Sequence, residues 1–518
     1  MANPAEKLAA SLEKLKRLQD KEVVGIKSSD LSRVDRERLM ASGFIREVLK
    51  GWYIASPHDE QQGNSTSWYN SFWGFCSRYL EDRHGDNYCL SPEQSLNLHA
   101  GNISVPKQLV IKATKGNNLP TNLLFDTSIF AMRGPIPDNA EMAMWNELRI
   151  TSLPSSIIHC TSSCFESHAT EVRTALLMIQ DASELLTLLL NGGHSTIAGR
   201  IVGAFRNIKK YKIADDILKT MKSAGYDVRE TDPFEEPTPI TFESYERSPY
   251  ANRIKLIWQK MRETVVEVFP EAPGMPDDKE ILLQQIDDLY TTDAYHSLSI
   301  EQYIVSPVLI ERVRSGEWNT AANEADKNQK HAMAARGYWK AFEAVKNSIQ
   351  KVFNGENAGY VADADHGDWY RALFGPSVNV GILTPSDLAG YRTNQVYIGQ
   401  SKHIPLTKDG IRDAMPVLFE LLKQERHPGV RAVLGHFIFV YIHPYMDGNG
   451  RMGRFLMNVM LISGGYPWTV IPVEERVRYM NTLENASVDM DIKPFAEFIA
   501  WLVESGLHGA PVANLDKR

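Results

Sequence analysis

Two neighbouring apolar helices joined by a polar turn constrain the fold of this chain more than any other feature. The segment VRAVLGHFIFVYI, residues 430–442, is apolar nearly all round, so it should form a central buried helix. It stops at Pro444, and a second helix, RMGRFLMNVMLIS, starts at Arg451. The turn between them is rich in Gly, Asp and Asn. At a helix N-terminus, free N–H groups and the positive end of the helix dipole point outward, which makes an anion site.

Length and composition indicate a soluble protein of several domains. The chain has 518 residues, of which 43% are hydrophobic and 23% charged, and its net charge is -8. Two to four domains are expected, and the whole protein is not a polycation that coats nucleic acid. No apolar run reaches the length of a membrane span, and the N-terminus lacks the apolar region of a signal peptide. We therefore expect a cytoplasmic protein that does not bind membranes.

Four cysteines in so long a chain argue against a disulfide scaffold. Two of them lie near histidines in the order His159, Cys160, Cys164 and His168. This spacing matches no strong zinc pattern, and small buried cysteines are common. We expect buried thiols there and no metal cluster.

The chain divides into four stretches of different character. Residues 1–56 read as a small helical module that ends in a hairpin, and residues 57–230 mix strands with helices. Residues 231–245 are rich in proline and acidic residues and are interpreted as a linker. Residues 246–518 are mostly helical. The predicted fold is thus multidomain, with a small winged-helix module, an α+β domain and a larger helical domain.

The polar turn contains the residue types that phosphate chemistry needs. Gly448 and Gly450 allow the backbone to approach an anion closely. Arg451 and Arg454 are three residues apart, so both can face one polyphosphate. Asp447 is a hard oxygen ligand suited to Mg²⁺ between phosphates.

Two further residues complete this set. His443, at the end of the buried helix, can take a proton from an attacking hydroxyl, because an imidazole pKa near 6.5 suits a general base at neutral pH. Asn449 can hydrogen-bond a phosphate or a sugar. A lone histidine in a core is usually structural, but the surrounding turn favours a catalytic role here.

The stretch from His443 to Arg454 resembles the signature of the Fic family, H-x-F-x-D-G-N-G-R-x-x-R, with Tyr445 in place of the usual Phe. The resemblance covers about residues 245–505. It implies that His443 is the general base and that Asp447 binds Mg²⁺. It also implies that the ATP phosphates are held by the rest of the motif: Gly448, Asn449, Gly450, Arg451, Gly453 and Arg454.

Two flanking segments agree with this resemblance. The β-rich segment NQVYIGQSKHIPL resembles the family's flap, a small β-hairpin that holds the target side chain in register; its candidate docking residues are Gln400, Ser401, Lys402, His403 and Ile404. The helical tail of the core offers Tyr479 as a candidate for the adenine pocket. The alternative is that Tyr479 is an ordinary half-buried helix residue.

Upstream of the core, HSLSIEQY resembles the inhibitory motif S/T-x-x-x-E-G/N of Fic proteins, with Ser297 and Glu301 at the key positions. A carboxylate paired with Arg454 would remove the donor that orients the ATP γ-phosphate. Gln302 departs from the pattern, because Gly or Asn is usual there. Alternatively, Glu301 is a surface helix residue. In some relatives this glutamate also helps to hydrolyse AMP back off the target, so a bifunctional enzyme is a further alternative.

The N-terminal half loosely resembles the AbiEi family of antitoxin-like, winged-helix transcription regulators, as in toxin–antitoxin systems. On this interpretation Arg33, Arg36 and Arg38 lie on a recognition helix that binds DNA, with Arg46 and Lys50 on the wing. The alternative is a module that recruits protein and whose arginines are only solvated.

Taken together, these features predict a protein adenylyltransferase that uses ATP and Mg²⁺ to attach AMP to a Ser, Thr or Tyr hydroxyl of a target protein or of itself. Three alternatives stay open: mainly AMP removal, transfer of another group on the same fold, and a DNA-binding regulator whose helical half senses nucleotide. A homodimer is also a candidate state.

Overall fold

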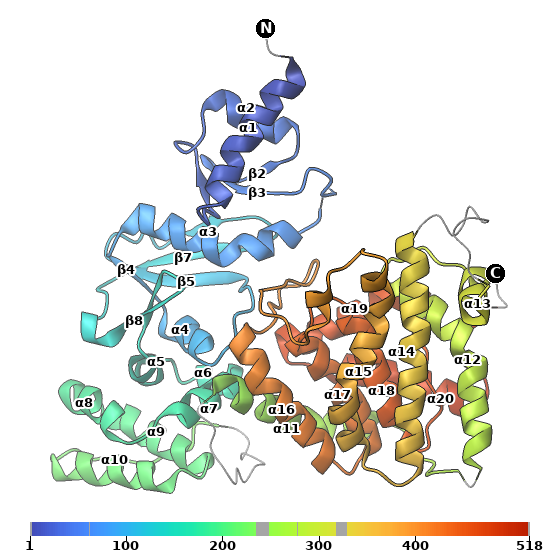
Figure 1. Ribbon diagram of the computed structural model, residues 1–518. Helices are drawn as coiled ribbons and strands as arrows, with labels where there is room; N and C mark the ends of the chain where they lie inside the picture. The colour runs from blue at the N-terminus through green and yellow to red at the C-terminus, as the bar shows by residue number, and fades with distance from the viewer. Residues whose placement is uncertain (1–2, 62, 235–247, 277, 318–328, 516–518) are drawn as a thin grey trace. The chain divides into compact units, whose positions relative to one another are not determined.

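The computed structural model describes residues 3–61, 63–234, 248–276, 278–317 and 329–515 (Figure 1). The chain divides into two compact units. The first contains Met1–Arg253 together with Tyr397–Ile404, and the second contains Ile254–Val396 and Pro405–Arg518. Most of the predicted linker 231–245 lies outside the described residues. None of the helices in the described ranges combines the length and the apolar run that a membrane span requires.

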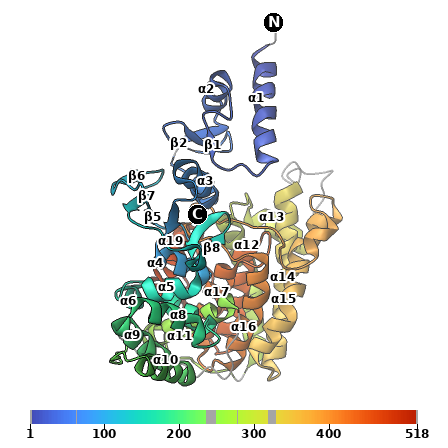
Figure 2. The same ribbon diagram turned by 90° about the vertical axis from the view of Figure 1, so that its left-hand side faces the viewer.

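The N-terminal module consists of two helices and a three-stranded antiparallel sheet: α1 (Pro4–Gln19), β1 (Ile26–Lys27), α2 (Arg33–Ala41), β2 (Ile45–Leu49) and β3 (Trp52–Ala55), with strand order β1-β3-β2. Helix α1 begins with a capping box, in which Asn3 and Glu6 accept each other's main-chain N–H groups. Figure 2 shows α1 and α2 next to each other. The expected hairpin is present as β2 and β3. The assignment of the module as a winged helix stays a prediction.

A small mixed sheet forms the centre of the next region, with strand order β4-β5-β7-β6. Its strands are β4 (Tyr88–Leu90), β5 (Gln108–Ala113), β6 (Pro120–Asn122) and β7 (Ser128–Arg133), and β5 and β7 pair in parallel. Helix α3 (Thr66–His84) lies along one face of this sheet (Figure 1). Large aromatic side chains of α3 are buried in the core: Trp68, Phe72, Phe75 and Tyr79. A separate hairpin joins β8 (Met142–Trp145) to β9 (Leu148–Thr151).

Short helices complete the first unit: α4 (Pro92–His99), α5 (Leu153–His159), α6 (Cys164–Ser167), α7 (Ala169–Met178), α8 (Ser183–Gly192), α9 (Ser195–Asn207) and α10 (Tyr211–Ser223). The four cysteines of the chain are buried free thiols in this unit. The first unit therefore mixes strands and helices, as expected.

A buried ion pair lies among these helices. Arg253 Nη1 donates to Glu171 Oε1 over 2.6 Å, and the two side chains are 1% and 5% exposed. Asn102 Nδ2 donates to the same carboxylate oxygen over 2.9 Å. Burial favours the neutral acid, but the charge of Arg253 prevails and lowers the pKa of Glu171.

Because breaking such a pair leaves a buried charge without its partner, Glu171→Gln is expected to lower the free energy of unfolding by about 3 kcal/mol. Urea denaturation of the full chain would measure this loss. The matched control is Glu166→Gln, which changes an exposed glutamate in the same region. Equal unfolding midpoints for the two variants would contradict the importance of the pair.

The second unit is almost entirely helical. Its helices are α11 (Pro249–Val268, from Ile254 onward), α12 (Lys279–Ile300), α13 (Pro307–Ser315), α14 (Gln329–Phe353), α15 (Ala358–Asn379), α16 (Lys408–Gln424), α17 (Pro428–Ile442), α18 (Asn449–Ile462), α19 (Arg476–Glu484) and α20 (Lys493–Leu507). Helix α17 packs on α18, and both contact neighbours on several sides (Figure 1).

The predicted central helices are confirmed. Nearly every residue of α17 is buried, from Gly429 to Ile442, and so is almost all of α18. Pro428 occupies the first turn of α17, where its missing N–H costs no hydrogen bond. A helix that is apolar all round must lie inside the protein, so this pair forms the centre of the unit.

The expectation of a β-hairpin at residues 394–406 is wrong. In this segment, which the structure describes in full, the chain forms no strand. Only the expected turn is present, where the Ser401 N–H donates to the Ile398 carbonyl over 3.2 Å, with Gly399 and Gln400 between them. Two main-chain groups of the segment, the Gln400 N–H and the Lys402 carbonyl, are bonded to Thr66 and Val105 instead.

Candidate functional site

The turn between α17 and α18 owes its shape to two residues with positive φ. His443 ends α17 in the left-handed conformation (φ 56°, ψ 60°), and Gly448 precedes α18 with φ 81°. The Asn449 side chain fastens the turn from inside, because its Oδ1 accepts the Tyr445 N–H (2.9 Å) and its Nδ2 donates to the Tyr445 carbonyl (2.8 Å). Both polar atoms of the Asn449 side chain are thus bonded to the main chain of Tyr445. The main-chain N–H of Asn449 is one of the donors that a helix start leaves without an intrahelical partner.

The two glycines of the turn lie so close to neighbouring side chains that a Cβ at either position would clash. A Cβ on Gly448 would lie 2.7 Å from the Phe374 ring. A Cβ on Gly450 would overlap Oε1 of Glu301. A carboxylate therefore lies directly over the first turn of α18, where the helix dipole favours negative charge.

His443 has its imidazole set in one tautomer. Nδ1 lies 3.2 Å from the Val440 carbonyl, so Nδ1 carries the proton and Nε2 keeps its lone pair. The side chain is half-buried. Burial lowers the pKa of His443 to about 4, with a further lowering from Arg392, so the ring is neutral at physiological pH. A neutral imidazole with a free Nε2 is the form that a general base requires.

Arg392 holds the main chain at this histidine. Its Nε donates to the His443 carbonyl over 2.8 Å, and its N–H donates to the Pro444 carbonyl over 2.9 Å. The guanidinium also donates to Leu406 and Asn394 carbonyls. Burial lowers the pKa of Arg392 to about 10, which leaves it charged. Sequence reasoning did not single out this residue, because a buried arginine that binds carbonyls has no pattern distinct from a surface one.

Arg454 is bound by the end of α12. Its Nε donates to Ser297 Oγ (2.9 Å), and its Nη2 donates to the Ser297 carbonyl (3.1 Å) and to Glu301 Oε1 (2.8 Å). The side chain is 5% exposed. Nη1 is buried and has no hydrogen-bond partner among the described residues. Although burial opposes the charge, Glu301 raises the pKa of Arg454.

Glu301 is the counter-charge at the centre of the site. Its side chain is 26% exposed. Burial alone would raise the pKa of this carboxyl, but Arg454 and Arg451 together lower it below its ordinary value. Glu301 is therefore ionised at neutral pH and occupies the positive region that a phosphate would need.

Arg451 is held by aromatic rings. Its guanidinium carbon lies 5.1 Å from the centroid of the Tyr303 ring and 5.1 Å from that of Phe374. One nitrogen, Nη2, reaches Asp447 Oδ2 over 3.3 Å. The side chain is 1% exposed, and its Nε has no partner within the described part of the chain. Both arginines of the turn thus keep one buried N–H group unpaired.

Asp447 is the exposed acid of the turn. Its side chain is 64% exposed, and Oδ1 accepts the Gly448 N–H over 2.6 Å. A single exposed carboxylate beside phosphate donors fits Mg²⁺, which binds through one or two carboxylates, several waters and substrate phosphates.

Tyr479 is not on an open pocket wall in this structure. Its side chain is 1% exposed, and its hydroxyl lies 2.7 Å from His436 Nε2. The ring also packs near Phe495 and Phe498. Burial also lowers the pKa of His436 to about 3, so this histidine is neutral.

The candidate docking segment belongs to the first unit. The Gln400 N–H donates to Thr66 Oγ1 over 3.0 Å, and the Lys402 carbonyl accepts the Val105 N–H over 2.9 Å. Ile404 is buried in the aromatic core around α3, and His403 is 3% exposed. Ser401 accepts the His403 N–H on its hydroxyl (3.0 Å). Segment Tyr397–Ile404 is therefore held in the first unit by hydrogen bonds and by the burial of Ile404.

The three N-terminal arginines differ in their surroundings. Arg33 is 83% exposed and pairs with Glu37 on the same helix. Arg36 donates to the Leu31 carbonyl over 2.6 Å, and Arg38 donates to Ser11 Oγ over 2.7 Å. Two of the three therefore hold the module together. Of these three arginines, only Arg33 has most of its side chain exposed.

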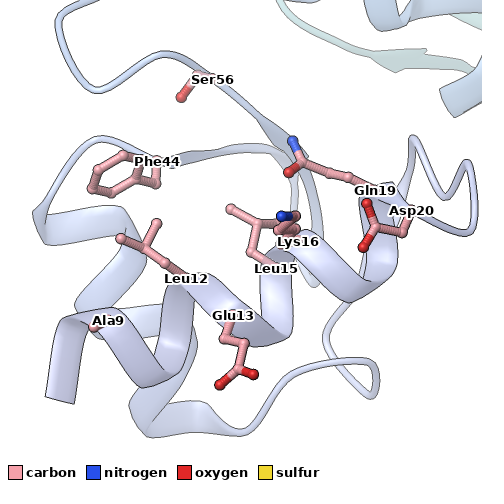
Figure 3. A pocket seen from close by; sticks show the side chains of 9 residues that line it. All are labelled: Ala9, Leu12, Glu13, Leu15, Lys16, Gln19, Asp20, Phe44 and Ser56. Atoms are coloured by element: carbon pink, nitrogen blue, oxygen red, sulfur yellow. The ribbon is translucent and has the colours of Figure 1, made fainter. Parts of the chain in front are cut away.

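A groove of about 720 Å³ runs beside α1 in the same module (Figure 3). Apolar Leu12, Leu15 and Phe44 line it, and Glu13 and Asp20 add carboxylates. Lys16 also lines the groove, so its charged lining is two carboxylates against one ammonium, which does not favour a DNA backbone.

Comparison with known proteins places the turn within a recognised domain. The Fic/DOC family model matches residues 368–461. Protein adenylyltransferase Fic of Drosophila mojavensis is 39% identical over 132 residues, which are 25% of this chain and 26% of the relative. The Drosophila melanogaster protein of the same name gives the same figures. The chain matches about a quarter of the length of these curated relatives.

Solved structures of Fic proteins are also similar. Fic-1 (residues 134–508) from C. elegans covers 66% of this chain and 96% of its own, with 16% identity and a TM-score of 0.37. A Fic family protein from Desulfovibrio desulfuricans covers 53% of this chain and 76% of its own, with 18% identity and a TM-score of 0.35.

Proposed function

We propose that this chain, in which residues 368–461 form a Fic domain, is a protein adenylyltransferase that transfers AMP from ATP to a hydroxyl group of a protein. The relatives that match this region carry the name protein adenylyltransferase Fic. One observation supports the proposal most directly. A neutral histidine, His443, ends α17 in the turn that leads into the start of α18, and the first turns of α18 carry Arg451 and Arg454.

The reaction follows from these groups. The hydroxyl oxygen of the target attacks the α-phosphorus of ATP, and His443 Nε2 takes the hydroxyl proton. The bond between the α-phosphorus and the bridging oxygen breaks, so pyrophosphate leaves and AMP stays on the target. Arg451, Arg454 and the N–H groups at the start of α18 stabilise the charge on the phosphates.

Mg²⁺ would be held by Asp447 together with phosphate oxygens, where it neutralises charge on the triphosphate. The exposed carboxylate supports this assignment. The experiment that tests the proposed function is intact-protein mass after incubation with ATP and Mg²⁺. A gain equal to AMP on the chain or on an added target supports it, and no gain by a Glu301→Gly variant on itself or on any protein in a cell lysate would refute it.

The ion pair between Glu301 and Arg454 supports autoinhibition. While Glu301 occupies this arginine, the γ-phosphate lacks its donor and the α-phosphate is badly placed for attack. Ser297 supports the same closed arrangement, because its hydroxyl and carbonyl both accept from Arg454.

A second candidate function is removal of AMP, by the same enzyme or as its main activity. The observation that favours it is the position of the Glu301 carboxylate over Gly450, in the turn that His443 begins. A carboxylate near the reacting phosphorus can activate a water molecule. Incubation of AMP-modified protein without ATP would test it: release of AMP by wild type and not by Glu301→Gln supports it.

We also propose target docking on residues 400–404, DNA binding through Arg33, and a homodimer. The bonds of Gln400 and Lys402 to the first unit mean that a target would have to compete for these groups. A DNA-binding module would lose affinity steeply as salt rises.

The pH dependence of transfer gives a separate prediction. Because burial holds the pKa of His443 at about 4, the base is neutral throughout the usual assay range. In a Glu301→Gly variant the pKa should be lower still, since Glu301 raises it. We expect initial rates that do not fall between about pH 8 and pH 6, where an ordinary histidine would titrate. A loss of rate with a midpoint near the ordinary histidine pKa would contradict this account of His443.

A further inference from the structure

The residues after Glu301 make a second contact with the phosphate site. Helix α12 is closed by a Schellman cap in which Gln302 adopts φ 65°, the left-handed conformation. The Gln302 N–H donates to the Ser299 carbonyl (2.9 Å), and the Tyr303 N–H donates to the Leu298 carbonyl (3.0 Å). This cap fixes Tyr303 relative to Glu301.

Tyr303 contacts the other arginine of the turn. Its ring centroid is 5.1 Å from the guanidinium carbon of Arg451, whose side chain is 1% exposed. A cation–π contact is strong when both groups are desolvated. Glu301, two residues earlier in the same cap, accepts a hydrogen bond from Arg454 Nη2 on Oε1 over 2.8 Å. One short segment thus contacts both arginines.

We propose that Glu301 and Tyr303 form a two-point latch, in which Glu301 occupies Arg454, Tyr303 occupies Arg451, and Gln302 sets how firmly the latch closes. The proposal rests on the proposed function and extends its autoinhibition to a second arginine. Because both contacts lie on one cap, opening of the cap frees both arginines together. The unpaired Nη1 of Arg454 and Nε of Arg451, both buried, are then available to phosphate oxygens.

Gln302 sets the strength of the latch through its backbone. The left-handed conformation is unfavourable for residues with a Cβ, and glycine adopts it without this strain. The Gln302 side chain is exposed, so its replacement by glycine loses no buried contact. Gln302→Gly should therefore stabilise the closed latch. We expect it to weaken ATP binding and lower basal transfer by about threefold.

The test of Tyr303 uses the full chain and two readouts, the dissociation constant for ATP and the rate of AMP transfer. Tyr303→Ala should tighten ATP binding and raise transfer by about fivefold, because it removes the contact with Arg451. Tyr303→Phe keeps the ring and should resemble wild type. The matched control is Tyr360→Ala, which removes a 60% exposed tyrosine that also contacts a cation, Lys423 at 4.7 Å.

The same substitution in a Glu301→Gly background separates a latch from a simple support for Arg451. A latch predicts no further gain from Tyr303→Ala, since the segment is already released. A loss of ATP affinity in that background would overturn the proposal, because Tyr303 would then position Arg451 for the nucleotide. If Glu301→Gly transfers no AMP to any protein, the proposed function fails, whereas the ATP dissociation constants still decide whether Tyr303 acts as a latch.

Discussion

Replacing His443 with alanine should lower AMP transfer by about two to four orders of magnitude, the usual contribution of a general base. His443 is the group whose Nδ1 is bonded to Val440 and whose Nε2 is free to accept a proton. Within the described part of the chain, the His443 side chain forms no hydrogen bond with Arg451 or Arg454, so phosphate binding should persist. Initial rates with labelled ATP, together with ATP dissociation constants, would measure both effects.

The control for this substitution is His508→Ala, which removes an exposed histidine from the end of α20. It should leave transfer unchanged. The measurements are best made in a Glu301→Gly background, where the starting rate is high. Substantial AMP transfer by the His443→Ala variant would refute the assignment of the base. Loss of ATP binding as well would indicate a damaged turn instead.

Replacing Glu301 with glycine should raise transfer by about tenfold to a hundredfold, the range that one charge-assisted hydrogen bond can contribute. The reason is that Glu301 holds Nη2 of Arg454 and lies over Gly450. Self-modification should show the gain most clearly, as an intact-mass increase equal to AMP.

Glu301→Gln separates charge from shape, because it keeps the size of the side chain and removes its negative charge. It should activate less than glycine but more than Glu504→Gln, which changes an exposed glutamate of α20. Since the pKa of Glu301 is lowered, mild acidification should leave the carboxylate charged and the enzyme restrained. Equal transfer by wild type and Glu301→Gly would mean that the ion pair does not restrain the enzyme.

The turn at the centre of the site and its two flanking helices could be predicted from short stretches of sequence. The apolar run of α17, its end at His443 and the glycine-rich start of α18 all depend on neighbours within a few residues. Such short-range features follow from helix geometry and from the conformational freedom of glycine, which need no knowledge of the rest of the fold. The Fic-domain match at residues 368–461 agrees with this reading.

Other predictions failed or changed where distant packing decides. Nothing local shows that the backbone around Gln400 and Lys402 is bonded to Thr66 and Val105, so the segment looked like a free hairpin. The sequence left Tyr479 either at an adenine pocket or half-buried on its helix, and the structure buries its side chain to 1% exposure. Alternating β-formers predict a strand only if a partner strand is available.

By itself, then, the sequence determined the turn between α17 and α18, its two flanking helices and the residue types there that suit phosphate chemistry. Only the tertiary structure decided which partner each of those residues has: Glu301 with Arg454, 153 positions apart, and Tyr303 with Arg451. The reason is physical. Spacing along a helix fixes which side chains share a face, but contacts between distant segments depend on how buried surfaces pack against one another.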